Sequence, residues 1–208
     1  MKKLLVLAAI AIVGFSKVNA QDGVDKVIEQ AKNGGFYVGA NLGFSLISSN
    51  KFYNNSNDEN FGSFNFGFDA AYLFEVIPNL EVGLLTGYTQ FIADGKYTSF
   101  DEDNNGGNFV FVDFKDASFV PVAASVRYYF ADRKFFGGLD LGVGINVSGD
   151  VKTGFYARPK FGFNLNKITL IASFQSISGG QDYKSSNNIN VYSLNGFKSI
   201  NAGIEYAF

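Results

Sequence analysis

The chain contains no cysteine and no histidine, and its only methionine is Met1. The absence of cysteine excludes disulfides, thiolate metal sites and a lipidated N-terminal cysteine. The absence of histidine removes the commonest general base and transition-metal ligand, and it excludes a serine–histidine hydrolase. No other pairing of nucleophile and base is recognisable. We therefore expect no enzymatic activity, no catalytic residue, no metal site and no cofactor.

Proline is rare, tryptophan is absent and the formal net charge is only −2, whereas the chain has 24 glycines, 24 phenylalanines and 11 tyrosines. The weak negative charge gives no sign of a nucleic-acid partner. Glycine costs about 1 kcal/mol relative to alanine inside a helix, so this composition disfavours helices. It suits closely approaching β-strands that carry large outward side chains.

The first twenty residues have the pattern of a secretory signal peptide. Lys2 and Lys3 are followed by an apolar run from Leu4 to Phe15, and small or β-branched residues precede Gln21. A run of about 12 apolar residues is too short to span a bilayer, so we expect cleavage before Gln21 and export. Residues 21–34 then form a short polar lead before the remaining domain, 35–208.

Apolar residues alternate with small or polar residues from Phe36 to the end of the chain. One run places Val122, Ala124 and Val126 against Ala123 and Ser125. Eight runs of this kind, each near the ten residues that a tilted strand needs to cross a bilayer, are recognisable. They cover residues 36–46, 64–74, 80–88, 120–130, 139–147, 155–165, 168–175 and 200–208.

Short and long connections alternate between these runs. The short ones are 77–79, 131–134 and 166–167, and the longer, polar ones are 48–61, 92–117, 148–154 and 178–193. Membrane barrels have short periplasmic turns and longer outer loops. The pattern therefore predicts an all-β fold, an eight-stranded antiparallel up-and-down transmembrane β-barrel in a bacterial outer membrane, with both termini periplasmic.

A soluble exported barrel that carries a hydrophobic ligand would also alternate, with its apolar face inward. The minor face here consists mostly of glycine, serine, asparagine and alanine, whereas a water-exposed face would carry many more lysines and glutamates. Aromatic residues also gather near both ends of the runs, as in the girdles of membrane barrels. The predicted girdle residues are Phe36, Tyr72, Phe74, Tyr128, Phe130, Phe135, Tyr206 and Phe208 at one end, and Phe64, Phe119, Phe155, Phe174 and Tyr192 at the other.

Four positions conflict with regular membrane strands. Pro121 and Pro159 fall inside runs, and because proline cannot donate a ladder hydrogen bond, we expect a bulge or a strand end at each. Thr86 and Gln90 are polar at lipid-facing positions. They suggest that the third run leaves the membrane or slips register there.

The last residues resemble the C-terminal assembly signal of outer-membrane barrels, because Ile204, Tyr206 and Phe208 place apolar or aromatic residues at alternate positions and end in phenylalanine. The run 127–130 (RYYF), before a short turn, is similar to the porin-family barrels related to OmpA and OmpX. This resemblance implies insertion by the barrel assembly machinery into outer-membrane lipid. Nothing follows Phe208, so we expect no peptidoglycan-binding domain.

Seven charged residues fall on the minor face, which should line the lumen. They are Asp69, Glu81, Arg127, Asp140, Arg158, Lys160 and Glu205. Eight strands leave a lumen that side chains can fill, and buried charges must pair there. We expect a packed plug of ion pairs; a gate or narrow ion path is the alternative.

Residues 101–106 (DEDNNG) match the start of an EF-hand calcium loop, but Val112 stands where a glutamate is required. We therefore interpret the segment as an acidic loop.

The leading hypothesis for the protein is a monomeric barrel with a structural or interaction role: envelope integrity, adhesion or partner binding through loops 48–61, 92–117 and 178–193. The alternative is a narrow porin-like channel for ions or small solutes.

Overall fold

A computed structural model describes residues 34–51, 60–92, 96–101, 108–113, 116–149, 151–184 and 190–208. The predicted signal peptide and all of the polar lead except Gly34 lie outside these residues. The strands are β1 (Gly35–Lys51), β2 (Asn60–Ile77), β3 (Leu80–Phe91), β4 (Lys96–Asp101), β5 (Asn108–Asp113), β6 (Ala117–Phe130), β7 (Phe135–Ser148), β8 (Gly154–Leu165), β9 (Ile168–Ile177), β10 (Gln181–Lys184) and β11 (Asn190–Ala207).

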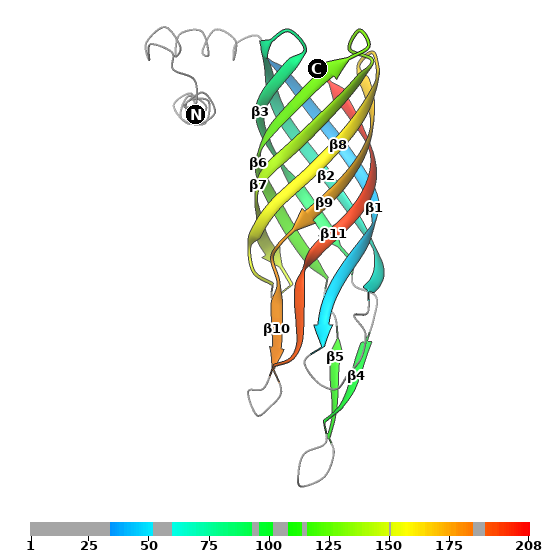
Figure 1. The fold of residues 1–208 in the computed structure, drawn as a ribbon, viewed down its shortest axis with the longest axis vertical. Coiled ribbons are helices and arrows are strands. Elements are labelled where there is room, and N and C mark those ends of the chain that lie inside the picture. The colour runs from blue at the N-terminus through cyan, green and yellow to red at the C-terminus, as the bar shows by residue number, and fades with distance from the viewer. Residues whose placement is uncertain are drawn as a thin grey trace, which may run out of the picture.

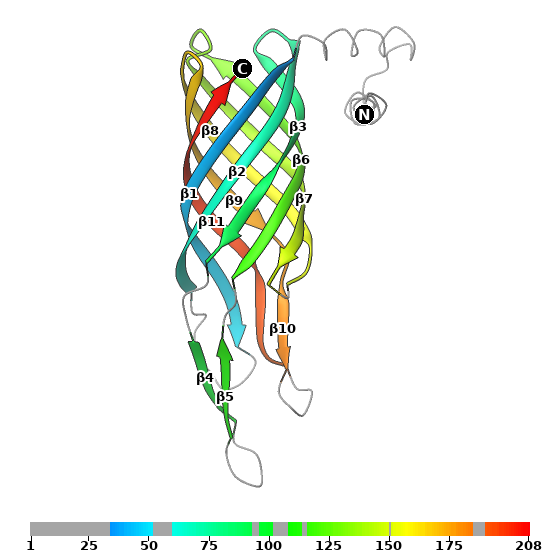
Figure 2. The same ribbon diagram turned by 180° about the vertical axis from the view of Figure 1, so that it is seen from behind.

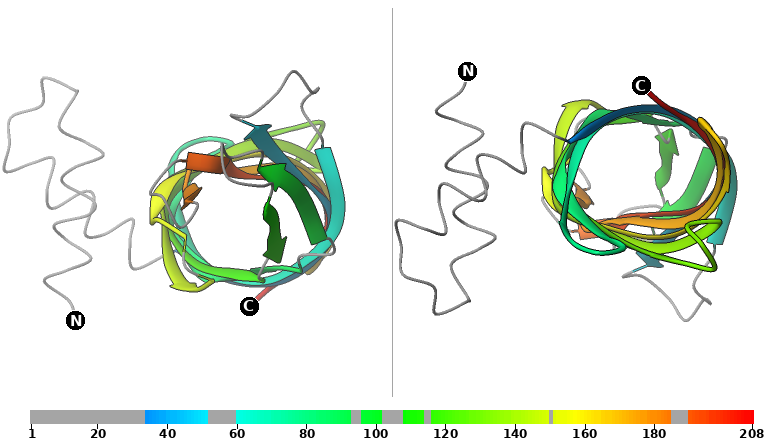
Figure 3. Two further views of the ribbon diagram at one scale, coloured as in Figure 1. Left: turned by 90° about the horizontal axis from the view of Figure 1, so that it is seen from below. Right: turned by 90° about the horizontal axis from the view of Figure 1, so that it is seen from above.

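Eight of these strands close into a barrel (Figures 1 and 2). Neighbours pair in the order β1, β2, β3, β6, β7, β8, β9 and β11, and β11 pairs again with β1. Every pairing is antiparallel, and Figure 3 shows the resulting ring along the axis. The predicted fold class is confirmed, and it is the fold that the resemblance to OmpA- and OmpX-related barrels implies.

The three predicted short turns all lie at one end of the barrel, together with the C-terminus (Figure 1). Asn79 and Asn166 adopt φ angles of 68° and 59°, which asparagine tolerates better than most residues. The turn between β6 and β7 has three consecutive non-glycine residues in the left-handed region, Ala131, Asp132 and Arg133. We call the end of the barrel that carries the three short turns the turn end, and the opposite end the loop end.

The loop end carries additional strands that the alternating pattern does not predict. Within the connection 92–117, β4 and β5 form a separate two-stranded sheet. Within 178–193, β10 pairs with the outer part of β11. Both features extend beyond the ring of eight strands in Figure 1. The acidic segment 101–106 lies outside the described residues apart from Asp101, so its interpretation stays a prediction.

Large apolar side chains cover the outer surface of the barrel. Leu42, Phe44 and Phe64 are more than 60 % exposed, whereas Arg127 and Asp140 are fully buried inside. This distribution is the reverse of a soluble barrel and suits a lipid environment. The residues that the structure describes include no helix with the length and apolarity needed to cross a bilayer.

Neither proline ends or bulges its strand, so that expectation is wrong. Pro121 pairs with Gly144, and Pro159 with Leu139, in ladders without a register shift at those positions. An antiparallel residue directs its N–H toward only one neighbouring strand, so proline weakens one ladder and leaves the other intact. The strand containing Thr86 and Gln90 also keeps its register with both neighbours there.

Two aromatic residues assigned to the outer girdles are buried. Phe119 is 0 % exposed and belongs to the interior, and Phe74 is only 7 % exposed. Other predicted girdle residues do face outward, among them Tyr128 at 55 % and Phe208 at 72 % exposure. The side chain of Tyr192 lies outside the described residues.

Candidate functional site

The seven predicted charged residues meet in the lumen, and the small residues of the minor face make room for them. A Cβ at Gly162 would lie 2.1 Å from the ring of Phe136, and a Cβ at Gly43 would lie 2.1 Å from the Asn201 Oδ1. Glycine is therefore required where long side chains lie across the inner wall. The interior that looks open in the ribbons of Figure 3 is filled by these side chains.

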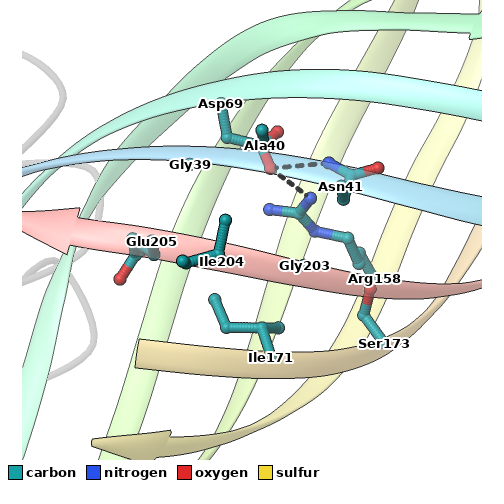
Figure 4. A pocket seen from close by; sticks show the side chains of 10 residues that line it. All are labelled: Gly39, Ala40, Asn41, Asp69, Arg158, Ile171, Ser173, Gly203, Ile204 and Glu205. Carbon is teal, nitrogen blue, oxygen red and sulfur yellow. Dashed lines mark hydrogen bonds and ion pairs between the residues drawn. The ribbon is translucent and has the colours of Figure 1, made fainter. Parts of the chain in front are cut away.

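The middle of the lumen holds a chain of four charged side chains. The Lys160 Nζ lies 2.6 Å from the Asp140 Oδ1, and the Arg158 Nε lies 2.9 Å from the other oxygen, Oδ2. The Arg158 Nη1 also reaches the Asp69 Oδ2 at 2.7 Å, and Asn41 donates to the same oxygen (Figure 4). Lys160 donates further to Ser125. Strands β2, β6, β7 and β8 are thereby linked.

A second ion pair crosses the lumen nearer the turn end. The Arg127 Nη1 and Nη2 donate to the two Glu205 carboxylate oxygens, each over 2.6 Å. The Arg127 guanidinium also lies 4.8 Å from the ring centroids of Tyr37 and Phe136. The side chains of Arg127 and Glu205 are 1 % and 5 % exposed. Two parallel hydrogen bonds of this kind give the strongest and most directional form of a carboxylate–arginine pair.

Glu81 is the centre of a cap at the turn end. Its carboxylate accepts hydrogen bonds from Arg133, Tyr129 and Tyr37. The Arg133 guanidinium lies 4.1 Å from the Tyr129 ring centroid and also contacts Glu75. Burial alone would lower the pKa of Arg133, but the Glu81 carboxylate raises it and keeps the guanidinium charged. The Arg133 side chain is therefore held against Glu81 and Tyr129 at the turn end.

Arg133 was missed by sequence reasoning because it lies in a turn, outside the alternating pattern. Its left-handed turn lets the side chain fold back over the strand ends. Asn164 donates to the Arg133 carbonyl and so helps to hold this conformation. Arg133 and the seven predicted residues supply four carboxylates and four cations, so these eight charges cancel, and the exposed Glu75 adds one negative charge at the rim.

Three phenylalanine rings fill the lumen toward the loop end. Phe91, Phe119 and Phe197 have ring centroids 5.0 to 6.0 Å apart, and each side chain is at most 2 % exposed. We call these three residues the aromatic plug. They come from β3, β6 and β11, and all three occupy minor-face positions in the alternation. Their inward-facing positions in the alternation are the sequence signal from which they could have been predicted.

A small cavity remains beside the network. Its volume is about 10 Å³, and Gly39, Gly203, Ser173, Arg158 and Glu205 are among the residues that line it (Figure 4). A volume of this size has room for about one water molecule. Among the described residues, some buried polar atoms nearby have no hydrogen-bond partner, including the Asn41 Oδ1 and the Asp69 Oδ1. The lumen can therefore hold single waters among its side chains.

The structure brings all seven predicted lumen charges into ion pairs with one another or with Arg133. The three predicted assembly-signal residues instead face outward: Ile204, Tyr206 and Phe208 are 50 %, 40 % and 72 % exposed. The backbone N–H of Phe208 donates to the Phe36 carbonyl and so joins the chain end to β1. The role of these residues in assembly stays a prediction.

No protein-family model matches the chain, and no curated protein matches it. Among solved structures, the outer membrane protein OprG from Pseudomonas aeruginosa is 12% identical, with 84% of this chain and 96% of that chain covered and a TM-score of 0.46. Neisserial surface protein A is 14% identical, with 83% and 97% covered and a TM-score of 0.42. The attachment invasion locus protein Ail of Yersinia pestis is 14% identical, with 82% and 98% covered and a TM-score of 0.40.

The class of this protein therefore rests on its own strand pairing and surface. It is a closed eight-stranded antiparallel β-barrel whose large apolar side chains point outward and whose charged side chains are paired inside.

Proposed function

We propose that this protein is a bacterial outer-membrane barrel with a structural or interaction role, exported through a cleaved signal peptide and oriented with its turn end in the periplasm. The role includes envelope integrity, adhesion or partner binding at the loop end. The proposal includes no catalytic activity, because the chain has neither histidine nor cysteine and no pairing of a nucleophile with a base is recognisable.

The filled lumen is the observation that supports this proposal. A solute entering from the loop end meets the aromatic plug, then the neutral ion-pair network, and finally the Arg133 cap. Removing either partner of a buried ion pair leaves an uncompensated charge, at a cost of about 3–5 kcal/mol. The interior is therefore suited to holding the eight strands together rather than to passing solutes.

The loop end offers the surface on which a partner could bind. The strands β4, β5 and β10, and the outer parts of β1 and β11, extend there beyond the ring. Connections 48–61, 92–117 and 178–193 all belong to this end. A rigid barrel that presents such segments is a common arrangement for recognition, because scaffolds position variable loops.

Conductance in a planar bilayer separates this proposal from the alternative of a narrow channel. We expect the wild-type protein to show no steady openings. The matched variants are Phe119→Ala, which acts on the aromatic plug, and Phe155→Ala, which acts on the lipid-facing surface. Steady wild-type openings whose size changes in Phe119→Ala but not in Phe155→Ala would overturn the proposal in favour of a channel.

A structural role of the barrel in the envelope and an interaction role of the loop end can be distinguished in cells. A variant in which residues 96–113 are replaced by a short glycine–serine linker removes the β4–β5 sheet and leaves the ring of eight strands. If this variant restores detergent resistance to a deletion strain as well as the wild type does, the barrel itself supports the envelope. Failure to restore it, with the variant folded by heat-modifiable gel migration, assigns the role to the loop end.

A further inference from the structure

Two outward-facing residues near the turn end are covered, unlike other apolar residues of the outer wall. Val82 of β3 pairs with Val126 of β6, so the two valines lie side by side on the outer face. Val82 is only 8 % exposed, whereas Val126 is 37 % exposed. Phe74 of β2 pairs with Val82 and is 7 % exposed, whereas Phe130, another aromatic residue at the turn end, is 43 % exposed. We call Phe74 and Val82 the covered patch.

The chain enters β1 directly beside the covered patch. Gly35 pairs with Leu73, so Gly34 precedes β1 at the level of Phe74. A Cβ on Gly34 would lie 2.7 Å from the ring of Tyr72, which pairs with the outward-facing Phe36. The backbone that precedes Gly34 therefore starts from the outer wall, at the edge of the covered patch.

The sequence before Gly34 has the periodicity of an amphipathic helix. Its apolar residues recur at the spacing i, i+3, i+4 and i+7, which places them on one helix face: Val24, Val27, Ile28 and Ala31. Asp22 is a favourable N-cap, and Gly34 and Gly35 are favourable residues to end a helix. The charged residues fall outside the apolar face: Asp25, Lys26, Glu29 and Lys32.

We propose that residues 23–33 form an amphipathic helix whose apolar face packs on the covered patch, outside the barrel at the turn end. The low exposed fractions of Phe74 and Val82 are those of a single chain, so neither lipid nor a second copy accounts for them. A helix of this length is about 16 Å long and neighbouring strands lie about 5 Å apart, so one helix face can cover both residues.

The charged side of such a helix points away from the barrel and toward water, as in helices that lie at a membrane interface. The segment then fastens the start of the mature chain to the outer wall. This inference goes beyond the proposed function, which assigns no role to residues 21–33.

Disulfide cross-linking tests which side of the segment contacts the covered patch, in a chain that has no native cysteine. The full chain carries Val82→Cys together with one of four second changes and is oxidised in mild detergent. Three of these changes lie on the apolar face, and Glu29→Cys is the matched control outside it: Val27→Cys, Ile28→Cys and Ala31→Cys against Glu29→Cys. We expect an intramolecular disulfide from the apolar face and its loss in the control. Equal cross-linking of all four variants, or none from the apolar face, would rule the docked helix out.

Thiol reactivity supplies an independent measurement, because Val82 and Val126 are paired valines on the same wall. In the same detergent, Val82→Cys should react with N-ethylmaleimide at about one fifth of the rate of Val126→Cys, the ratio of 8 % to 37 %. Adding Val27→Ser and Ile28→Ser should raise the rate of Val82→Cys alone. Similar rates in the two single variants, or protection of Val82→Cys that persists with both serines, would contradict the inference. Heat-modifiable gel migration verifies that each variant is folded.

Discussion

Replacing Arg127 by methionine should be among the most destabilising single changes in this barrel. The substitution removes two hydrogen bonds of 2.6 Å and leaves the Glu205 carboxylate, 5 % exposed, without its cation. Breaking a buried pair in this way costs about 3–5 kcal/mol. The opposite change, Glu205→Leu, should cost a similar amount because it leaves the guanidinium unpaired.

The double variant Arg127→Met with Glu205→Leu should recover most of the lost stability. Replacement of a whole buried ion pair by apolar residues of similar volume is often neutral or stabilising. The three variants and the wild type therefore form a cycle in which we expect a coupling free energy of at least about 3 kcal/mol. Urea unfolding in vesicles, followed by tyrosine fluorescence and by gel migration, measures the four free energies.

The pair Arg133–Glu75 supplies the matched control. Its side chains are 41 % and 48 % exposed, and its ion pair is 3.1 Å long. An exposed pair of this kind contributes about 0–1 kcal/mol. The reasoning fails if Arg127–Glu205 shows a coupling no larger than Arg133–Glu75, because burial would then have no influence on the cost of an unpaired charge.

Two further predictions concern the packing of the interior. Phe119→Ala should lower the free energy of unfolding by about 3–5 kcal/mol, because the ring is completely buried, whereas Phe155→Ala on the lipid face should cost much less. Equal losses measured by urea unfolding would contradict the interior position of Phe119. Gly162→Ala should prevent or strongly weaken folding, since the added Cβ would lie 2.1 Å from the Phe136 ring. Gly137→Ala, where a Cβ meets nothing within 4 Å, should fold like the wild type on a heat-modifiable gel.

The strand pattern could be predicted because a membrane barrel imposes one simple rule on each strand. Alternate residues face lipid or lumen, so the parity of a residue determines its surroundings. That rule placed Asp140 and Arg158 on the same inner face, and they do form an ion pair. It also indicated the interior position of Phe119, which was instead assigned to the girdle because aromatic residues occur on both faces.

The structural features that were not predicted depend on geometry that the alternation of inward and outward residues does not describe. Arg133 reaches the lumen from a turn, where three left-handed residues redirect the chain. The strands β4, β5 and β10 lie beyond the ring, within the connections 92–117 and 178–193 where the alternating pattern identified no run. Pro121 and Pro159 were expected to interrupt their strands, but each weakens only one of two ladders.

The long sequence separation within the network has a consequence for how the barrel is completed. Asp140 and Arg158 are 18 residues apart on paired neighbouring strands, so this contact is available as soon as one hairpin exists. The ion pair between Arg127 and Glu205 can form only when the last strand of the ring is in place, because Glu205 lies 78 residues later in the chain. A chain that lacks this strand therefore carries an uncompensated cation in its interior. Ring closure neutralises that cation and joins both edges in one step, which makes half-built barrels scarce at equilibrium.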